Sequence, residues 1–256
     1  MAITFDVQKS AVKAKGLVQR TLNDLTRPQF IKQMIWVSAF WLVAVVIILT
    51  NIHLLRTNFT NPVRPDDLIL DLIPETPQFL VFGEIISTLG TIVIAFAMWQ
   101  WRFEKLPMLL FLLGAMYILR SFVILMTPLA QIQPPSENFT EAHWIAQNFY
   151  HGMYFSGHTA SAFIQAFYIK GHALRDLALI LACLQVVVIL VSHSHYTIDV
   201  VGGLFVAYFF THFDFMRLVP ASLRYVWWMP WYQEPVVIKQ ANRALRDINS
   251  RQTEID

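Results

Sequence analysis

The residues best suited to chemistry lie in two short polar clusters, each followed by an apolar run. The later cluster, SHSHYTID, extends from Ser192 to Asp199 and places His195 four residues before Asp199. Because side chains at i and i+4 share a helix face, the Asp199 carboxylate can accept the imidazole N–H of His195. That contact fixes the tautomer and leaves the other ring nitrogen free as a nucleophile or base. The alternative is a purely structural His–Asp pair at a helix end.

The earlier cluster, YFSGHT, extends from Tyr154 to Thr159. Ser156 is a good N-cap residue, and Gly157 lets a ligand approach the backbone closely. A helix N-terminus of this kind favours phosphate binding, and His158 would lie in its first turn. The pattern therefore predicts a phosphate site with an imidazole beside it, although a polar cap at a membrane surface would also explain it.

Charged residues in two other places could assist. Arg120 interrupts an apolar run, where a buried guanidinium is costly and could clamp phosphate oxygens in bidentate fashion; snorkelling toward the headgroups is the alternative. The segment Arg64–Glu75 carries Asp66, Asp67 and Asp71. These carboxylates could bind a cationic headgroup or order the loop, or they could be solvated surface charge.

Composition indicates that a membrane holds these clusters in place. Hydrophobic residues make up 56% of the 256 residues and charged residues 14%, whereas soluble domains carry roughly 25% charged residues. Six apolar runs are candidate membrane spans. They predict an all-α integral membrane protein, a bundle of six transmembrane helices. The runs are Met34–Ile52, Gln78–Gln100, Leu106–Met126, Ser156–Ile169, Leu174–Ser192 and Thr197–Phe215.

The distribution of Lys and Arg predicts the orientation of the bundle. Sixteen of the 19 basic residues flank the spans on one side, whereas Arg56 and Arg64 flank them on the other. The positive-inside rule then puts both termini in the cytoplasm, and Arg120, His158, His195 and Asp199 at the extracytoplasmic face. The net charge of +2 gives no reason to expect a nucleic-acid partner. We expect an amphipathic interfacial segment over 1–30, the catalytic bundle over 31–217 and an aromatic, basic cytoplasmic tail over 218–256.

At these motifs the sequence resembles the sphingomyelin synthase family, a branch of the type 2 phosphatidic acid phosphatase superfamily. The resemblance spans roughly residues 64–216. It is carried by PDDLILD at Pro65–Asp71, by Arg120-Ser121 with Thr127-Pro128, by the region Tyr154–Thr159 with its SGHT motif, and by the region His193–Val200 with its HYTxDV motif. His151 and Gly152 stand where those synthases have a Gly-Asp pair. Val188 and Ile189 stand where the classical phosphatases have a Ser-Arg pair, which favours the synthase branch.

The resemblance implies a triad of His158, His195 and Asp199 that transfers a phospho-headgroup from a glycerophospholipid to a lipid alcohol such as ceramide, releasing diacylglycerol. We expect His195 to form a phosphohistidine and His158 to act as general acid and then base. Arg120, Ser156, Gly157 and His193 would hold the phosphate. Six further residues could contact the headgroup or the rest of the substrate: Asp66, Asp67, Asp71, His151, Tyr154 and Tyr196.

Three other functions stay open at this point. A lipid phosphatase or a phospholipase C-like enzyme would use water as the acceptor on the same scaffold. A transporter would line a path with polar residues through the full depth of several spans, whereas here they gather in one layer. A zinc site of His158, His193 and His195 is disfavoured because Asp199 suits an orienting role. We expect no metal and no other cofactor, two lipid substrates as partners, and a chain that is free to oligomerise.

Overall fold

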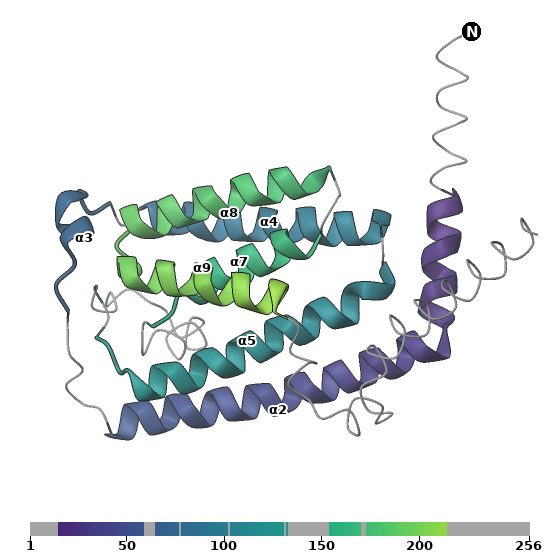
Figure 1. Ribbon diagram of the computed structural model, residues 1–256, viewed down its shortest axis with the longest axis horizontal. Helices are drawn as coiled ribbons and strands as arrows, with labels where there is room; N and C mark the ends of the chain where they lie inside the picture. The colour runs from purple at the N-terminus through teal and green to yellow at the C-terminus, as the bar shows by residue number, and fades with distance from the viewer. Residues whose placement is uncertain are drawn as a thin grey trace, which may run out of the picture.

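The computed structural model describes residues 15–58, 65–76, 78–101, 103–130, 132, 154–169 and 173–213. Within these ranges the regular structure is helical and contains no strand, as the sequence predicted. Figure 1 shows the helices aligned along one axis, apart from a helix at residues 15–26 that turns away where α2 begins. The elements are α2 (Pro28–Asn58), α3 (Leu68–Leu72), α4 (Phe79–Trp101), a 3₁₀ turn η1 (Phe103–Lys105), α5 (Leu106–Met126), α7 (Gly157–Tyr168), α8 (Leu174–Val191) and α9 (Thr197–His212).

Four of the described helices are long and apolar enough to cross a membrane, which makes the chain a multi-pass membrane protein. The candidate spans are Pro28–Leu55, Val81–Gln100, Phe103–Met126 and Leu174–Val191. The two remaining predicted spans correspond to shorter helices, α7 with 12 residues and α9 with 16. At 1.5 Å per residue, α7 covers only about 18 Å of a hydrocarbon core roughly 30 Å thick. The six-span count and the cytoplasmic termini therefore remain predictions.

The terminal segments of the sequence are described only in part. Residues 15–26 of the predicted interfacial segment are helical, and Leu22 and Leu25 on that helix are exposed. Residues 1–14 and the predicted aromatic and basic tail over 218–256 lie outside the described residues.

The bundle is built from helix pairs arranged around α7. The closest packing joins α2 to α5, α4 to α8, and α7 to α9, and α7 also packs against α8, α5 and α4. Although α7 is short, it is central because small side chains let its neighbours approach. Ala160 and Ala166 are fully buried, and a Cβ added to Gly203 of α9 would lie 2.8 Å from the Ser156 carbonyl oxygen. Outward-facing residues such as Leu42, Val43 and Val46 of α2 are exposed, as a lipid environment permits.

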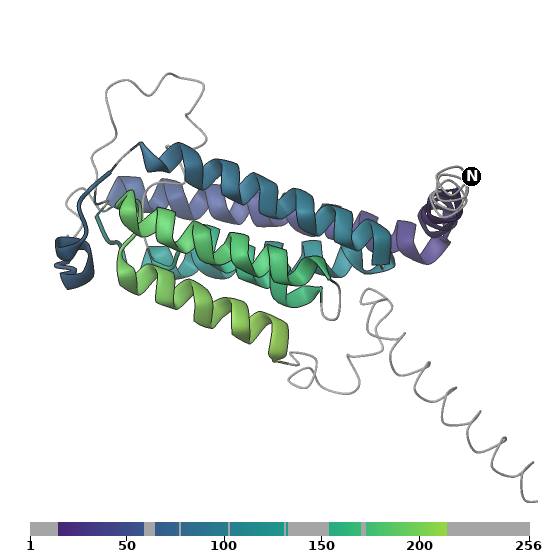
Figure 2. The ribbon, with the colours of Figure 1, turned by 90° about the horizontal axis from the view of Figure 1, so that it is seen from above.

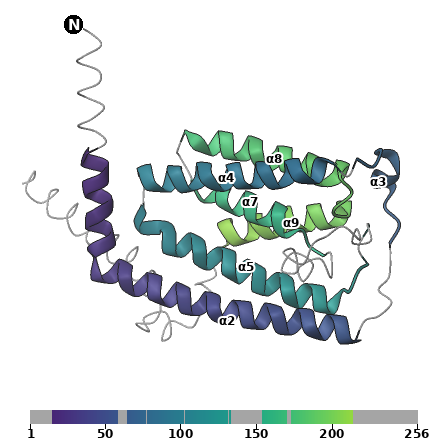
Figure 3. The ribbon, with the colours of Figure 1, turned by 180° about the vertical axis from the view of Figure 1, so that it is seen from behind.

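The alternating direction of the helices brings the polar clusters to one end of the bundle. There the last turns of α2, α5 and α8 meet the first turns of α4, α7 and α9, beside α3 (Figures 1 and 2). The view from behind shows the same gathering (Figure 3). Chain segments far apart in the sequence thus contribute to a single region.

Candidate active site

The His195–Asp199 contact lies at the start of α9. Nδ1 of His195 lies 3.4 Å from Oδ2 of Asp199, and the same oxygen accepts the backbone N–H of Tyr196 at 3.1 Å. This capping box explains why a carboxylate is tolerated at a helix start inside a membrane bundle. Both side chains are buried, at 9% and 0% exposure. The carboxylate therefore favours the tautomer that leaves Nε2 of His195 without the proton.

The first turn of α7 is fixed by its cap and by α9. Oγ of Ser156 accepts the backbone N–H of Thr159 at 3.3 Å, and Ser156 itself is fully buried. The backbone N–H of Ser156 donates to the carbonyl oxygen of Asp199 at 2.9 Å. This bond ties together the two helix starts that carry the histidines.

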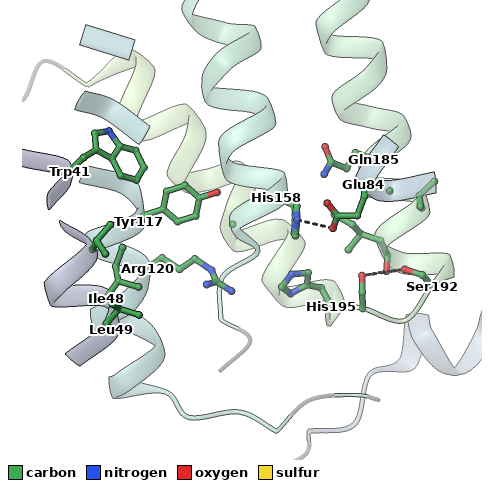
Figure 4. Close-up of a pocket in the computed structure, with 16 residues that line it drawn as sticks. Trp41, Ile48, Leu49, Glu84, Tyr117, Arg120, His158, Gln185, Ser192 and His195 are labelled. Atoms are coloured by element: carbon green, nitrogen blue, oxygen red, sulfur yellow. Dashed lines mark hydrogen bonds and ion pairs between the residues drawn. The ribbon is translucent and has the colours of Figure 1, made fainter. Parts of the chain in front are cut away.

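The two histidines lie next to each other on one side of a cavity (Figure 4). The ring centroids of His158 and His195 are 6.3 Å apart, with the planes inclined by 66°. On the other side of His158, Nε2 lies 3.4 Å from Oε1 of Glu84 in α4. The arrangement places two imidazoles beside one open volume, each with a carboxylate partner.

Arg120 completes one wall of this cavity. Its Nε donates to the carbonyl oxygen of Phe155 at 2.8 Å, which leaves the terminal amino groups on the far side of the guanidinium. Figure 4 shows the guanidinium pointing toward His195. The side chain packs on Gly157, where an added Cβ would lie 3.2 Å from Cδ of Arg120. Gly157 is thus required by the close approach of the arginine.

The cavity has a volume of about 410 Å³ and is mainly apolar. Arg120, Gly157, His158 and His195 all line it, while Asp199 lies behind His195. An apolar chamber with a few converging polar groups is the usual form of a small-molecule site. The remaining lining residues are Trp41, Val45, Ile48, Leu49, Gly83, Glu84, Tyr117, Gln185, Val188, Ile189, Ser192 and Ser194.

Several other candidates from the sequence lie outside the cavity lining. His193 has a φ of 51°, and its Nε2 lies 3.0 Å from the carbonyl oxygen of Ile73. The hydroxyl of the buried Tyr196 donates to the carbonyl oxygen of Ala130 at 3.1 Å. Tyr154 packs against Gly202, and Ser156 acts as the cap described above. These contacts hold the surrounding backbone, and His151 lies outside the described residues.

In the acidic segment, Asp67 makes contacts that hold α3 and the start of α9 together. Asp67 caps α3 and also accepts the backbone N–H of Thr197 at 2.6 Å and its hydroxyl at 3.0 Å. Desolvation raises the pKa of Asp67, but the hydrogen bonds from Thr197, Leu70 and Ile69 outweigh it and hold the pKa below its usual value. Asp66 and Asp71 are exposed and do not line the cavity.

Sequence reasoning missed Glu84, Gln185 and the aromatic pair Trp41 and Tyr117. A signal for Glu84 was available, because it is the sole charged residue in the run Gln78–Gln100, and intramembrane carboxylates are usually functional or paired. Within the described ranges, no group of three or more His, Cys, Asp or Glu side chains is arranged to hold a metal ion.

The fold and the site define a multi-pass helical membrane protein with two neighbouring histidines beside a mainly apolar cavity. A protein-family model described as AtPDCT1/2, the phosphatidylcholine:diacylglycerol cholinephosphotransferase family, matches residues 69–215, which is more than half of the chain. The chain belongs to this family of membrane lipid headgroup phosphotransferases. A comparison with curated proteins gives no match.

This family assignment corrects the resemblance drawn from the sequence. Membership of the sphingomyelin synthase family, and of the type 2 phosphatidic acid phosphatases, is wrong, because the matching family is a different one. The motifs misled for a physical reason. A histidine oriented by an aspartate, with a second histidine opposite, is what attack on a lipid phosphodiester needs. Such a set does not distinguish ceramide from another lipid alcohol.

Proposed function

We propose that this protein transfers phosphocholine from phosphatidylcholine to diacylglycerol through a phosphohistidine on His195. The observation that carries the proposal is the pair of imidazoles, 6.3 Å apart between centroids, on one wall of an apolar cavity. The His195–Asp199 contact supports the choice of His195 as nucleophile, because it favours the tautomer in which Nε2 carries no proton. The family assignment supports the choice of headgroup and acceptor.

In the first half of the reaction, Nε2 of His195 attacks phosphorus, and the bond between phosphorus and the glycerol oxygen breaks. Protonated His158 gives its proton to that oxygen, and diacylglycerol leaves. Asp199 stabilises the positive charge that develops on His195. Glu84, 3.4 Å from His158, holds that imidazole beside the cavity.

In the second half, His158 accepts the hydroxyl proton of an incoming diacylglycerol. The resulting oxygen nucleophile attacks phosphorus, the N–P bond to His195 breaks, and a new phosphatidylcholine forms. The bonds broken and formed are of the same kind in both halves. The overall equilibrium constant is therefore expected to be near unity, and one general acid–base group serves both directions.

Charge on the phosphoryl oxygens requires donors on the wall facing His195. Arg120 suits this task because its Nε is held by Phe155 and its terminal nitrogens remain on the cavity side. The backbone amides of the first turn of α7 add the partial positive charge of a helix N-terminus.

The proposed reaction takes place at the extracytoplasmic end of the bundle. The support is the excess of Lys and Arg in the flanks at the opposite end. The apolar lining of the cavity supports a lipid acceptor over water, because a dry chamber disfavours hydrolysis.

The test uses purified protein in phosphatidylcholine vesicles that contain diacylglycerol with a distinguishable acyl composition. The wild type should exchange headgroups between the two lipids without releasing free phosphocholine. His195→Ala should lose turnover while keeping its unfolding temperature. His158→Ala should allow the phosphocholine adduct on His195 to accumulate or to form slowly, as intact-protein mass spectrometry would show. Full exchange by the His195→Ala protein would exclude the mechanism, and release of free phosphocholine would identify a hydrolase.

A further inference from the structure

Within the described residues, packed helices enclose the cavity on three sides. α2 with α5 forms one wall, α4 with α8 forms the opposite wall, and α7 joins the two walls by packing against α5, α4 and α8. No comparable packing joins α2 to α4 within the described residues. The fourth side, between α2 and α4, is therefore where the cavity can open.

One face of α2 lines the cavity and lies next to the exposed outer face of the same helix. Trp41, Val45, Ile48 and Leu49 recur at helical spacing and all line the cavity. Within that face, Val45 is 45% exposed and Leu49 is 44% exposed. Val43, which does not line the cavity, is 56% exposed on the outer face, so the cavity wall and the outer surface of α2 are neighbours.

Two polar side chains that line the cavity are accessible. His158 has 47% of its side chain exposed and Glu84 has 61%, although Glu84 lies within the candidate span Val81–Gln100. Figure 4 shows both residues beside the cavity, near His195. An opening on the α2–α4 side would therefore lead to the reacting groups.

We infer that the gap between α2 and α4 is a lateral entrance from the bilayer, and that the α2 face of Val45, Ile48 and Leu49 binds an acyl chain of a glycerolipid substrate. This inference rests on the proposed function. The apolar face matches the chemistry of an acyl chain, and the histidines at its inner end match the headgroup linkage that the chain would bring. Donor and acceptor both carry such chains, so the shared ligand class is the diacylglyceryl tail.

The first test places a larger side chain in the proposed entrance. Val45→Trp should lower kcat/KM for long-chain phosphatidylcholine or diacylglycerol by roughly tenfold or more, because a cost of about 1.4 kcal/mol in binding is a factor of ten. Short-chain, detergent-soluble lipids should keep most of their rate. Val43→Trp is the matched control, since Val43 is 56% exposed on α2 and does not line the cavity. It should leave both rates unchanged.

Long-chain and short-chain lipids are then varied separately as donor and as acceptor. A chain-length effect confined to the donor assigns the α2 face to phosphatidylcholine, and one confined to the acceptor assigns it to diacylglycerol. Equal rates for Val45→Trp and wild type with every long-chain lipid would overturn the entrance.

A second readout does not depend on turnover. A phosphatidylcholine with a photoreactive group on its acyl chain is bound to the His195→Ala protein and illuminated, and the labelled residues are found by peptide mass spectrometry. Labelling should fall on Val45, Ile48 and Leu49 of α2 in preference to the outward-facing Val43 and Val46, and should be reduced at least severalfold in Val45→Trp. This labelling assay does not require catalysis. Labelling of the α2 face would therefore support the entrance even if His195 were not the nucleophile. Labelling spread evenly over the exposed face of α2, Val43 included, would show ordinary lipid contact and overturn the inference.

Discussion

Arg120 keeps its position through a hydrogen bond that a lysine is poorly shaped to reproduce. Its Nε donates to the Phe155 carbonyl while the terminal nitrogens face the cavity. Arg120→Lys keeps the charge but leaves the buried carbonyl without its donor, which should destabilise the protein by about 1–3 kcal/mol. Headgroup exchange should fall as well, because a single ammonium replaces a bidentate fork. Thermal unfolding in detergent and an exchange assay measure the two effects, and unchanged values for both would contradict this role.

The orienting role of Asp199 predicts a large kinetic effect with little structural loss. Asp199→Asn keeps the size of the side chain, but it can present its amide to His195 and favour the wrong tautomer. Exchange should slow by a factor on the order of 10⁴ if Asp199 acts as a triad orienter. Single-turnover formation of the phosphocholine adduct is the measurement. A defect confined to lipid binding, with adduct formation at the normal rate, would contradict the assignment.

At this scale the sequence predicted one contact between candidate residues but not their distant neighbours. The i, i+4 spacing of His195 and Asp199 predicted their contact, although His195 precedes α9 and the contact forms because the Asp199 carboxylate reaches back from the first turn of the helix. The long-range partners Glu84 and Phe155 could not be predicted, since they depend on how α4 and α5 pack. His193 is the instructive case: its place beside His195 in the chain suggested phosphate binding, yet its left-handed backbone turns the ring to Ile73.

At the scale of elements, the contact between α7 and α9 depends on a glycine. A Cβ at Gly203 would lie 2.8 Å from the Ser156 carbonyl oxygen, which is backbone and cannot easily move. Gly203→Ala should therefore destabilise the protein by about 1–3 kcal/mol and reduce exchange. Gly90→Ala is the matched control, because a Cβ there meets nothing within 4 Å. On α4 that replacement should be neutral or stabilising. Unfolding temperatures of the two variants give the comparison.

The link between α3 and α9 should depend on pH through Asp67. Its folded-state pKa lies below the usual value, so the ionised group stabilises the fold above the unfolded pKa near 4. That stabilisation is lost as the pH falls through the lower, folded-state pKa. Asp67→Asn should cost about 1 kcal/mol at pH 7, after allowance for screening. The difference from wild type should shrink as the pH falls below about 4, and a constant difference would argue against the ionised form.

Element boundaries followed the sequence where apolar runs were long. The predicted runs Gln78–Gln100, Leu106–Met126 and Leu174–Ser192 match α4, α5 and α8 closely, because hydropathy and helix length agree there. α2 begins earlier than predicted, at Pro28, since proline is favoured in the first turn of a helix. Helix α3 was not predicted, because five residues that depend on the Asp67 cap leave no periodic signal.

For the whole molecule, the expected orientation can be tested by labelling. The charge distribution predicts that the end bearing α3 faces away from the cytoplasm. In a Cys183→Ser background, which removes the sole cysteine, Asp71→Cys on exposed α3 should react with a membrane-impermeant maleimide added outside intact cells. Arg27→Cys, at a side chain that is 64% exposed at the opposite end, should react only after permeabilisation. The reverse pattern would invert the topology.

The class of the protein was within reach of the sequence, but its family was not. The apolar runs predicted a helical membrane protein, and the resemblance implied lipid headgroup transfer, which the matching family supports at that coarse level. The same resemblance gave ceramide as an acceptor and the wrong family, because the local motifs describe the reacting groups and not the acceptor.

Asp199 acts on the two histidines through two different groups: its carboxylate meets His195, while its main-chain oxygen secures the amide that opens α7. Replacing the side chain at position 199 removes the carboxylate contacts with His195 and with the backbone N–H of Tyr196, but keeps the main-chain bond to Ser156. Asp199→Asn and Ser156→Ala, made separately, would therefore distinguish loss of imidazole orientation from loss of the α7 cap.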